Sequence, residues 1–380
     1  MIKKIEIQGF KRFREKSFEI APLTLLTGLN GSGKTTLIHA LLLTWKASAL
    51  ANNCVGLKDL FGVDLGTAAG LRNWESNEAI KIVITSETTE PSVWEFGIES
   101  EDALYFDVNK YPEKCPNSYS GEPRAFSYLS AERWEPRMVL EDAPLSPGSL
   151  EIGVHGEYAA QLLATFGSKP LADKTRSHPD KRAEEISLLK YEVERWLSEI
   201  SRPVEIDTIL HPGSALTALR FRASGESEWV RAPNMGFGVS YALPIVLAGL
   251  TALSGGILIV ENPEAHLHPA GQSRMGVFLA WLAGRGVQVI LETHSDHVLN
   301  GVRRAIGEYS YLDANNALAH FFESTTEKTP LVHQLNFSTS GSISHWPFGF
   351  FDQFQLDAAS LGRIRRRENR APNSAQSGSQ

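Results

Sequence analysis

The sequence has few cysteines and no long apolar run. Its two cysteines, Cys54 and Cys115, stand far apart and lack the spacing of metal ligands, so we expect reduced thiols rather than a disulfide. The longest apolar segments, 243–253 and 257–260, are short or interrupted by Gly, Pro or Ser, whereas a membrane span needs roughly 18 uncharged residues. These absences predict a cytoplasmic protein with no membrane partner.

An excess of positive charge is also missing. The 380 residues include 37 Lys and Arg against 44 Asp and Glu, which gives a formal net charge of −7. A chain-wide attraction to nucleic acid or anionic lipid is therefore not indicated, although a local basic patch remains compatible with DNA binding. The opening Met-Ile-Lys-Lys-Ile-Glu-Ile alternates like a strand and does not form the apolar stretch of a signal peptide.

Strand and helix patterns both occur along the chain. Short apolar or alternating runs predict strands at residues 5–10, 17–20, 23–27, 80–85, 93–98, 104–108 and 126–131. The runs between 80 and 108 predict an antiparallel sheet beside the main core. Apolar residues at helical spacing predict one amphipathic helix, rather than a coiled-coil arm, at Leu189, Val193, Trp196, Leu197 and Ile200.

A glycine-rich segment joins the run 23–27 to a helical pattern. It consists of Gly28, Leu29, Asn30, Gly31, Ser32, Gly33, Lys34, Thr35 and Thr36. Glycines let backbone N–H groups close around a β-phosphate, and the following helix points its positive end at the anion. Lys34 reaches the β- and γ-oxygens, and the Thr35 hydroxyl binds Mg²⁺. The segment predicts binding of ATP with Mg²⁺.

A buried-strand pattern at 256–260 leads into acidic residues. The next residues read Glu261-Asn262-Pro-Glu264-Ala-His266-Leu-His268-Pro. We expect Glu261 to meet the Mg²⁺ held at the glycine-rich loop, because it stands at the end of the strand. No cysteine or second histidine pair lies near the two histidines, so a zinc site is not expected there.

Two further segments complete the set of candidate site residues. Residues 287–291 predict a buried strand that leads to His294, which can reach a γ-phosphate or order the attacking water. Gly236, Gly238 and Ser240 precede a helical run and form a second potential anion site at a helix N-terminus. By itself, Gly-x-Gly is also typical of an ordinary turn.

Together these four elements resemble the SMC/RecF-type ABC ATPases, which have a phosphate loop, signature loop, acidic strand and Thr-His-Ser switch in this order. The opening Ile-Gln-Gly-Phe-Lys-Arg-Phe is similar to that family's N-terminal hairpin, with Lys11 where a basic residue approaches the nucleotide. The chain is most similar to small bacterial AAA-type ATPases related to the OLD-nuclease ATPase domain. In these, Tyr-Leu-Ser-Ala-Glu-Arg (128–133), the acidic segment and Trp-Pro-x-Gly-Phe-Phe-Asp (346–352) occur together.

The resemblance implies an α/β fold: an ABC-type P-loop ATPase head with a mixed central sheet, a flanking antiparallel sheet and a helical subdomain. We expect one head over residues 1–361. Its parts are an N-terminal lobe (1–169), a helical insert (170–205) and a lobe with the signature, acidic strand and switch (206–361). Residues 362–380, first basic and then polar, are expected to be disordered.

The resemblance also implies a homodimer or higher oligomer around ATP, in which the signature loop at 236–240 contacts the γ-phosphate of another subunit. The family has Asp-Glu at the end of the acidic strand, with the Glu as general base. Here Asn262 takes that place, and an amide accepts no proton. Either Glu264 substitutes, or hydrolysis of ATP to ADP and phosphate is slow. Gly236 stands where Ser is common in the family, so the γ-phosphate contact of that Ser has no equivalent side chain here.

Related nucleases add a TOPRIM domain with an Asp-x-Asp pair, and no such pair occurs in this sequence. We therefore expect a separately encoded effector such as a nuclease, which similar ATPases accompany in bacterial phage-defence or mobile-element modules. The alternative is a RecF-like DNA-binding clamp in repair. A transporter subunit is the third hypothesis, disfavoured because no membrane-coupling segment is visible.

Overall fold

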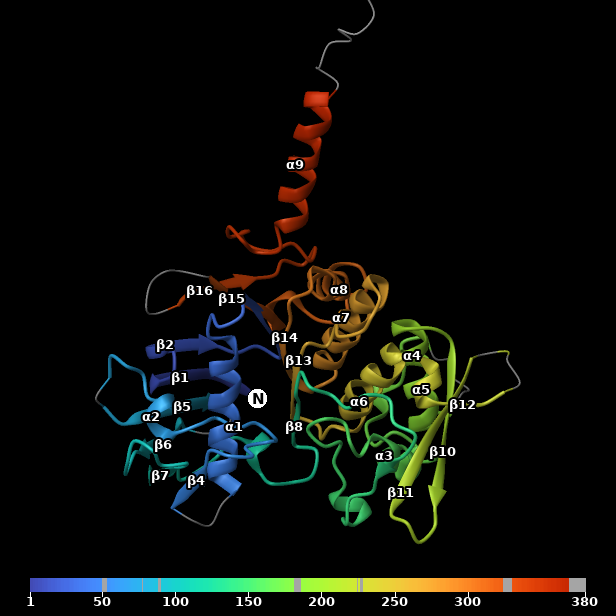
Figure 1. Cartoon of the computed structure of the whole chain (residues 1–380), viewed down its shortest axis with the longest axis horizontal. Coiled ribbons are helices and arrows are strands. Elements are labelled where there is room, and N and C mark those ends of the chain that lie inside the picture. The colour runs from blue at the N-terminus through green and yellow to red at the C-terminus, as the bar shows by residue number, and fades with distance from the viewer. Residues whose placement is uncertain are drawn as a thin grey trace, which may run out of the picture. The chain divides into compact units, whose positions relative to one another are not determined.

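Runs of apolar residues place six strands side by side in the central sheet of the computed structural model (Figure 1). The strands are β3 (Leu23–Gly28), β8 (Phe126–Leu129), β13 (Ile257–Glu261), β14 (Gln288–Glu292), β15 (Ala317–Glu323) and β16 (Leu331–Asn336). Their order is β16-β15-β3-β14-β13-β8, and all neighbours are parallel except β15 and β16. The carboxyl ends of β3, β13 and β14 therefore meet at one edge of the sheet.

The structure describes residues 1–368, except 50–52, 77, 88–89, 181–185, 224, 226–227 and 324–329. The chain divides into two compact units, Met1–Ser344 and His345–Gln380. All three sheets belong to the first unit. Among the described residues, no helix has the length and apolar character needed to cross a bilayer.

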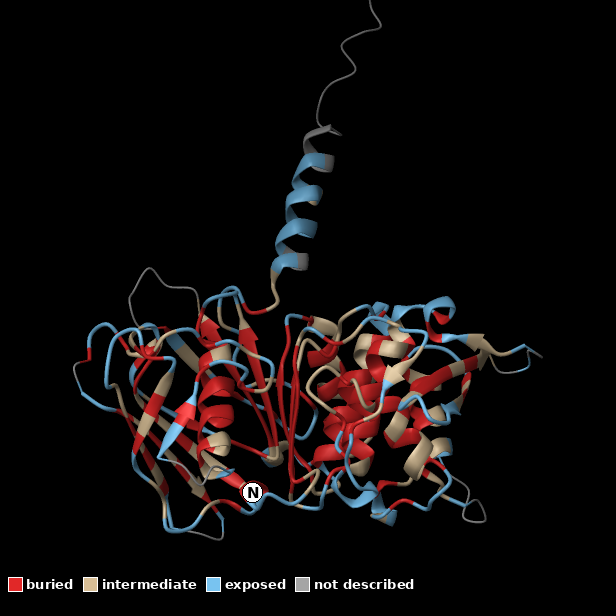
Figure 2. Cartoon of the chain, turned by 60° about the horizontal axis from the view of Figure 1, so that its bottom comes forward, coloured by how far each residue is buried: buried red, intermediate tan, exposed pale blue. Residues whose placement is uncertain are grey.

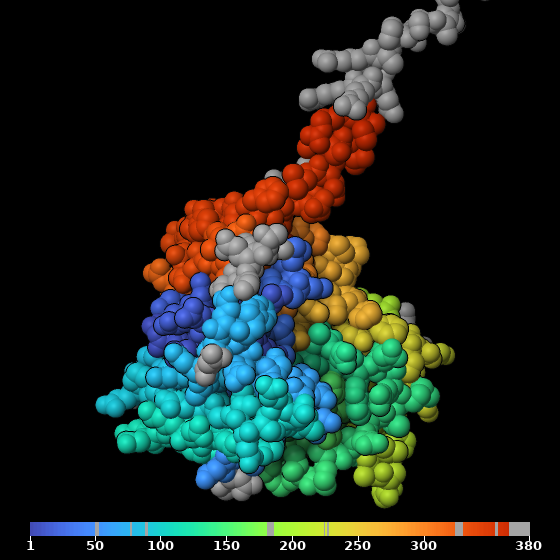
Figure 3. Space-filling model, turned by 60° about the vertical axis from the view of Figure 1, so that its left-hand side comes forward, coloured from blue at the N-terminus to red at the C-terminus, as the bar shows by residue number. Residues whose placement is uncertain are grey.

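A second sheet of six strands contains most of the N-terminal region. Its strands are β1 (Ile2–Phe10), β2 (Phe13–Glu19), β4 (Cys54–Gly56), β5 (Ile80–Ser86), β6 (Ser92–Gly97) and β7 (Tyr105–Lys110). The order is β2-β1-β5-β6-β7-β4, and every neighbouring pair is antiparallel. In the space-filling view, the blue to cyan residues of this sheet form a continuous surface (Figure 3). The expected flanking antiparallel sheet is thus confirmed.

Helix α1 (Lys34–Ala49) packs with both sheets. Its buried residues share one apolar cluster with Ile5 of β1, Ile82 of β5 and Ile259 of β13. The short helix α2 (Ala68–Leu71) contributes to the same cluster. Most of α1 is buried, as the red colour in Figure 2 shows. Because α1 begins at Lys34, the core that holds the helix also fixes the end of the glycine-rich loop.

The remaining helices of the first unit form a lobe with a small third sheet. The helices are α3 (Ala159–Phe166), α4 (Leu189–Ile200), α5 (Ala232–Met235), α6 (Phe237–Thr251), α7 (Pro269–Ala283) and α8 (Asp296–Gly307). The strands are β9 (Leu140–Glu141), β10 (Val204–His211), β11 (Leu216–Ala223) and β12 (Val230–Arg231). Helix α4 packs on α6 and α7 with its predicted apolar face buried, which confirms the amphipathic helix. Part of the expected helical insert, 181–185, lies outside the described residues.

The second unit contains α9 (Gln353–Glu368) and the Trp-Pro-x-Gly-Phe-Phe-Asp segment. The rings of Trp346 and Phe350 lie 4.9 Å apart in an edge-to-face arrangement. The tail that the sequence predicts to be disordered from residue 362 overlaps α9 over 362–368, because the helical pattern continues into the basic run. The rest of that tail, 369–380, lies outside the described residues.

Gln288 joins the first strand of the chain to the central sheet. Its side chain, at the start of β14, is buried. Its Oε1 accepts a hydrogen bond from Ile2 N at 2.8 Å, while its Nε2 donates to Ile2 O at 2.7 Å and to Ala21 O at 3.2 Å. One amide thus satisfies three main-chain groups at the junction of the two sheets.

We expect Gln288→Leu to lower the free energy of unfolding by about 2–4 kcal/mol, because it leaves buried main-chain groups without partners. The matched control is Gln8→Leu, which removes an exposed contact with Glu78 and should stay within about 0.5 kcal/mol of the wild type. Urea unfolding followed by circular dichroism measures both. Equal midpoints for the two variants would show that Gln288 does not hold the sheets together.

Candidate nucleotide site

The glycine-rich loop follows β3 and needs glycine at two close approaches. Gly28 has a φ of 133°, and a Cβ there would lie 2.2 Å from the Phe322 carbonyl oxygen. Gly33 has a φ of 109°, and its Cβ would lie 3.1 Å from the Phe13 ring. Neither position accepts a side chain without rearrangement. The loop therefore keeps its backbone close to β15 and β2 before α1 begins.

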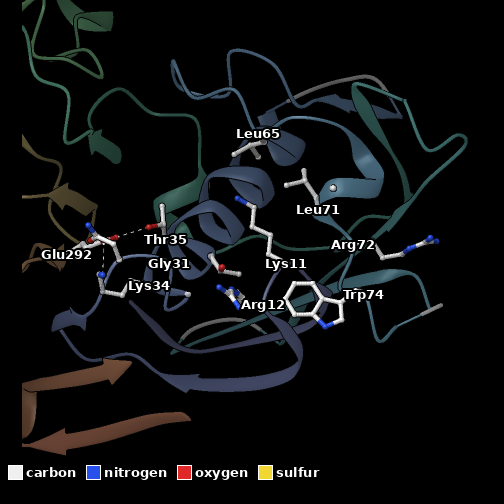
Figure 4. Close-up of a pocket in the computed structure, with 14 residues that line it drawn as sticks. Lys11, Arg12, Gly31, Lys34, Thr35, Leu65, Leu71, Arg72, Trp74 and Glu292 are labelled. Carbon is white, nitrogen blue, oxygen red and sulfur yellow. Dashed lines mark hydrogen bonds and ion pairs between the residues drawn. The ribbon is translucent and has the colours of Figure 1, made fainter. Parts of the chain in front are cut away.

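A cavity of about 550 Å³ opens beside this loop (Figure 4). The residues that line it are Lys11, Arg12, Asn30, Gly31, Gly33, Lys34, Thr35, Thr36, Leu65, Gly70, Leu71, Arg72, Trp74 and Glu292. Lys34, Thr35 and Glu292 lie together at one end, and Leu71, Arg72 and Trp74 lie toward the other. Four cationic residues and one carboxylate line the cavity, which suits an anionic ligand.

Lys34 and Thr35 both contact the Glu292 carboxylate. Lys34 is buried and donates hydrogen bonds to Gly28 O and Leu29 O, both at 2.9 Å. Its Nζ lies 3.5 Å from Glu292 Oε1, and the Thr35 hydroxyl donates to Glu292 Oε2 at 3.2 Å. Burial lowers the pKa of Lys34 and raises that of Glu292, and the attraction between the two opposes both shifts.

Glu261 lies beside Glu292 in the register of β13 and β14. Its Oε1 accepts a hydrogen bond from the Tyr128 hydroxyl at 3.1 Å. Burial, and then repulsion from Glu292, raise the pKa of Glu261 to about 7. A hydroxyl and two carboxylates supply hard oxygen donors, so the residues at this edge of the sheet fit a Mg²⁺ ion. Glu261 itself does not line the cavity.

Arg133 holds the main chain after Glu261 in place. Its guanidinium donates to Glu261 O at 2.8 Å and to Asn262 O at 2.6 Å, and it lies 5.6 Å from the Tyr241 ring. Asn262 has a φ of 45°, and Asn and Asp tolerate this left-handed conformation better than other residues with a side chain. The backbone therefore gives a structural reason for Asn262 besides any catalytic one.

Glu264 connects the acidic segment to the switch. Its Oε2 accepts from Thr293 Oγ1 and its Oε1 from His294 N, both at 2.8 Å. His294 is partly exposed to solvent, and the partial desolvation of its ring, with repulsion from Lys34, lowers its pKa. Ser295 continues the path by donating to Gln272 Oε1 at 2.6 Å and capping α8. The loops after β13 and β14 are therefore joined by hydrogen bonds.

The predicted signature loop lies away from the cavity of its own chain. Gly236 has a φ of 96° and precedes α6, and a Cβ on Gly238 would lie 3.2 Å from His266 O. The Phe237 ring stacks on His266 with centroids 5.1 Å apart and is 44% exposed. The Ser240 hydroxyl is buried without a hydrogen-bond partner among the described residues. The loop thus presents an aromatic side chain next to the acidic segment.

Lys11 reaches the cavity from the turn between β1 and β2. Its Nζ lies 2.5 Å from Nδ1 of His39. The backbone of Lys11 has a φ of 48°. Burial lowers the pKa of Lys11 to about 8, and burial with repulsion from Lys11 lowers that of His39 to about 3. His39 is therefore a neutral acceptor, and the Lys11 charge changes within an accessible pH range.

The structure brings together most of the predicted site residues. Lys11, Asn30, Gly31, Gly33, Lys34, Thr35 and Thr36 line the cavity, while Gly28 and Ser32 belong to its loop. Gly236, Gly238 and Ser240 are apart from it. Arg12, Arg72 and Trp74 also line the cavity, and no sequence motif predicts this position for them. Arg12 has a sequence signal, because it belongs to the basic Lys-Arg of the hairpin. Arg72 and Trp74 have none, because residues 70–74 fall in a region of turns.

Comparisons with known proteins give a family and a fold. Residues 23–300 match the family described as "AAA domain, putative AbiEii toxin, Type IV TA system". Residues 312–361 match the family described as "Protein of unknown function (DUF3696)". No curated protein matches the sequence.

Among solved structures, the fold is similar to two SMC head domains. One is an Smc head bound to the C-winged helix domain of ScpA, with 14% identity and a TM-score of 0.53 over 89% of this chain and 98% of that one. Another is an Smc head with an extended coiled coil, bound to the C-terminal domain of ScpA and derived from Pyrococcus furiosus. It has 12% identity and a TM-score of 0.50 over 96% and 99% of the two chains. The expected ABC-type head fold is confirmed.

We expect the affinity for ATP to fall as pH rises from about 7 to about 9.5, by about tenfold, because Lys11 loses its proton near pH 8. Phosphates favour the charged amine, so affinity is highest below that pKa and is lost above it. Lys11→Arg keeps its charge over this range and should show a smaller loss. Equilibrium binding of labelled ATP measures both. Identical pH profiles would show that Lys11 does not contact the phosphates.

Proposed function

We propose, from the premise that the chain belongs to the AAA-domain family that it matches over residues 23–300, that it is an ATP- and Mg²⁺-binding ABC-type ATPase head. The observation that carries this proposal is the end of the cavity at Lys34, Thr35 and Glu292. There, a glycine loop, a buried ammonium and a hydroxyl converge at the N-terminus of a sixteen-residue helix. This is the set of donors that binds a β- and γ-phosphate with its metal ion.

The other end of the cavity suits the nucleoside. The Trp74 ring is 59% exposed, and the Arg12 guanidinium lies 5.7 Å from its centre. Leu65 and Leu71 supply apolar surface on the same cavity. A planar base can stack on an exposed aromatic ring, while Arg12 and Arg72 neutralise phosphate charge. We infer that the base lies toward Trp74 and the triphosphate toward Lys34.

The position of the signature loop supports a proposal of ATP-dependent dimerisation. Phe237 and Gly238 lie beside His266, and neither they nor Ser240 line the cavity of their own chain. A loop at the N-terminus of the fifteen-residue helix α6 can bind an anion only if that anion comes from another molecule. We propose that a second copy supplies its ATP γ-phosphate to this loop, so that two heads close around two nucleotides.

We further propose that this head regulates a separately encoded effector, such as a nuclease, in a bacterial defence or mobile-element system. Outside the nucleotide site, the described residues contain one three-residue cluster of potential metal ligands, His178, Asp180 and Glu199. Its histidine accepts a hydrogen bond from Asp180 N and lies 3.0 Å from Glu199, which suits an ion pair more than a nuclease metal pair. The alternative function is a RecF-like DNA clamp, which ATP-dependent binding of DNA would support.

Slow hydrolysis is the rate that the acidic segment supports. Asn262 cannot accept a proton, and both oxygens of Glu264 already accept hydrogen bonds from the switch. If Glu264 is the base, it must therefore act from a carboxylate that already accepts two hydrogen bonds. We infer that ATP serves mainly as a clamp that holds the dimer closed.

We expect ATP with Mg²⁺ to convert the wild type from monomer to dimer, and Ser240→Arg to prevent this by placing bulk and charge at the γ-phosphate contact. Phe237→Arg is a second variant with the same expected result, because Phe237 is the exposed side chain of this loop. Light scattering with and without ATP measures the mass of each protein.

Two controls accompany this experiment. Lys34→Ala should neither bind ATP nor associate, because it removes the charge that faces the phosphates. Tyr191→Arg adds the same side chain on the exposed face of α4 and should associate like the wild type. A wild type with one mass in both conditions would contradict the ATP-closed dimer.

We expect slow turnover by the wild type and faster turnover by Asn262→Glu, within the 10²–10⁴-fold that general-base catalysis contributes. The left-handed backbone at this position costs about 1 kcal/mol with Glu, so Asn262→Asp, which tolerates that conformation, is a second variant. Release of phosphate at saturating ATP measures the rate. Glu264→Gln should remove the residual turnover while ATP still binds. Fast wild-type turnover that survives Glu264→Gln would make the assignment wrong.

A further inference from the structure

Glu292 is a carboxylate in a cavity that otherwise offers cations to its ligand. Lys11, Arg12, Lys34 and Arg72 line the same cavity. A carboxylate beside a bound triphosphate repels it, unless a divalent cation lies between them. Glu261, which the sequence predicts as a metal ligand, does not line the cavity, and its Oε1 accepts a hydrogen bond from Tyr128. Glu292 is therefore better placed for a metal ion that accompanies the nucleotide.

The contact between Glu292 and Thr35 has the spacing of two ligands of one ion. Mg²⁺ takes six oxygens at about 2.0–2.1 Å, so two adjacent ligands lie about 3.0 Å apart. The distance from Thr35 Oγ1 to Glu292 Oε2 is 3.2 Å. Small side-chain movements suffice to place an ion against both oxygens. We propose that Glu292 is a carboxylate ligand of the nucleotide-bound Mg²⁺, together with the Thr35 hydroxyl.

Lys34 explains why this role requires the nucleotide. In the structure, Lys34 lies 3.5 Å from Glu292 and donates to the carbonyls of Gly28 and Leu29. When a triphosphate occupies the loop, Lys34 turns to its oxygens, and Glu292 then needs another cation. Glu292 would then bind the divalent cation in place of the ammonium. This inference rests on the proposed binding of ATP, and it predicts that Mg²⁺ controls the affinity for ATP through Glu292.

The experiment compares equilibrium binding of labelled ATP in Mg²⁺ and in EDTA. The wild type should bind at least about tenfold more weakly in EDTA, because Glu292 then faces the phosphates without a metal ion. Glu292→Gln should bind more tightly than the wild type in EDTA, and its advantage from Mg²⁺ should fall to about two- to threefold. The matched control is Glu194→Gln, a partly buried carboxylate of α4 outside the cavity, which should keep the wild-type ratio.

A second measurement reads the metal directly. Electron paramagnetic resonance of free Mn²⁺, titrated into protein with one equivalent of ATP and, for comparison, into the same concentration of ATP alone, gives the apparent dissociation constant of the ion on the protein. We expect an increase of about tenfold for Glu292→Gln and a smaller one for Glu292→Asp, which keeps the charge on a shorter side chain. Thermal unfolding checks that each variant is folded.

The outcomes distinguish this inference from the proposed function. If the wild type binds no ATP in Mg²⁺, the proposed function fails. If the wild type binds ATP but Glu292→Gln changes the affinity equally in Mg²⁺ and in EDTA, Glu292 is not a metal ligand. Its role is then limited to its contacts with Lys34 and Thr35 in the absence of nucleotide. An unchanged Mn²⁺ dissociation constant would likewise overturn the assignment.

Discussion

The parallel pairing of β3, β14 and β13 is the constraint on which the rest of the site depends. It brings three carboxyl ends to one edge of the sheet, so that Gly28, Glu292 and Glu261 become neighbours although more than 200 residues separate the first from the others. The glycine loop, the acidic segment and the switch each continue from one of these ends. Burial of α1 between the two sheets then fixes Lys34 and Thr35 against Glu292.

Charges of both signs meet at this edge of the sheet. Four cationic residues and Glu292 line the cavity, and Glu261 lies beside Glu292 at the end of the neighbouring strand, where burial and repulsion from Glu292 raise the pKa of Glu261 to about 7. Lys34 lies beside Glu292, and Arg133 donates a hydrogen bond to the Glu261 carbonyl. An anion that carries its own metal ion would suit this arrangement, since the anion would meet the cations and the metal ion would meet Glu292.

Local patterns predicted those parts of the molecule that depend on contiguous residues. Each of these patterns lies within about fifteen residues, because hydrophobic periodicity and turn-forming residues are local properties. They are the glycine loop, the acidic strand, the switch strand and the amphipathic face around Trp196. The contacts that assemble the cavity are tertiary. Nothing in the sequence indicates that Trp74 and Lys34 line the same cavity, or that Tyr128 donates a hydrogen bond to Glu261. Asn262 is intermediate: its departure from the family pattern is visible, but its left-handed backbone is not.

The Gln288 contact has a consequence for how the chain melts. The strand that it anchors, β1, leads to Lys11 at the cavity, and its own strand, β14, ends at Glu292 on the opposite wall. A nucleotide that contacts both Lys11 and Glu292 would therefore link the ends of β1 and β14, in addition to the link that Gln288 makes at their starts. Its binding free energy adds to the cohesion between the two sheets. A nucleotide bound as proposed would therefore oppose separation of the antiparallel and central sheets, which already share one apolar cluster around α1.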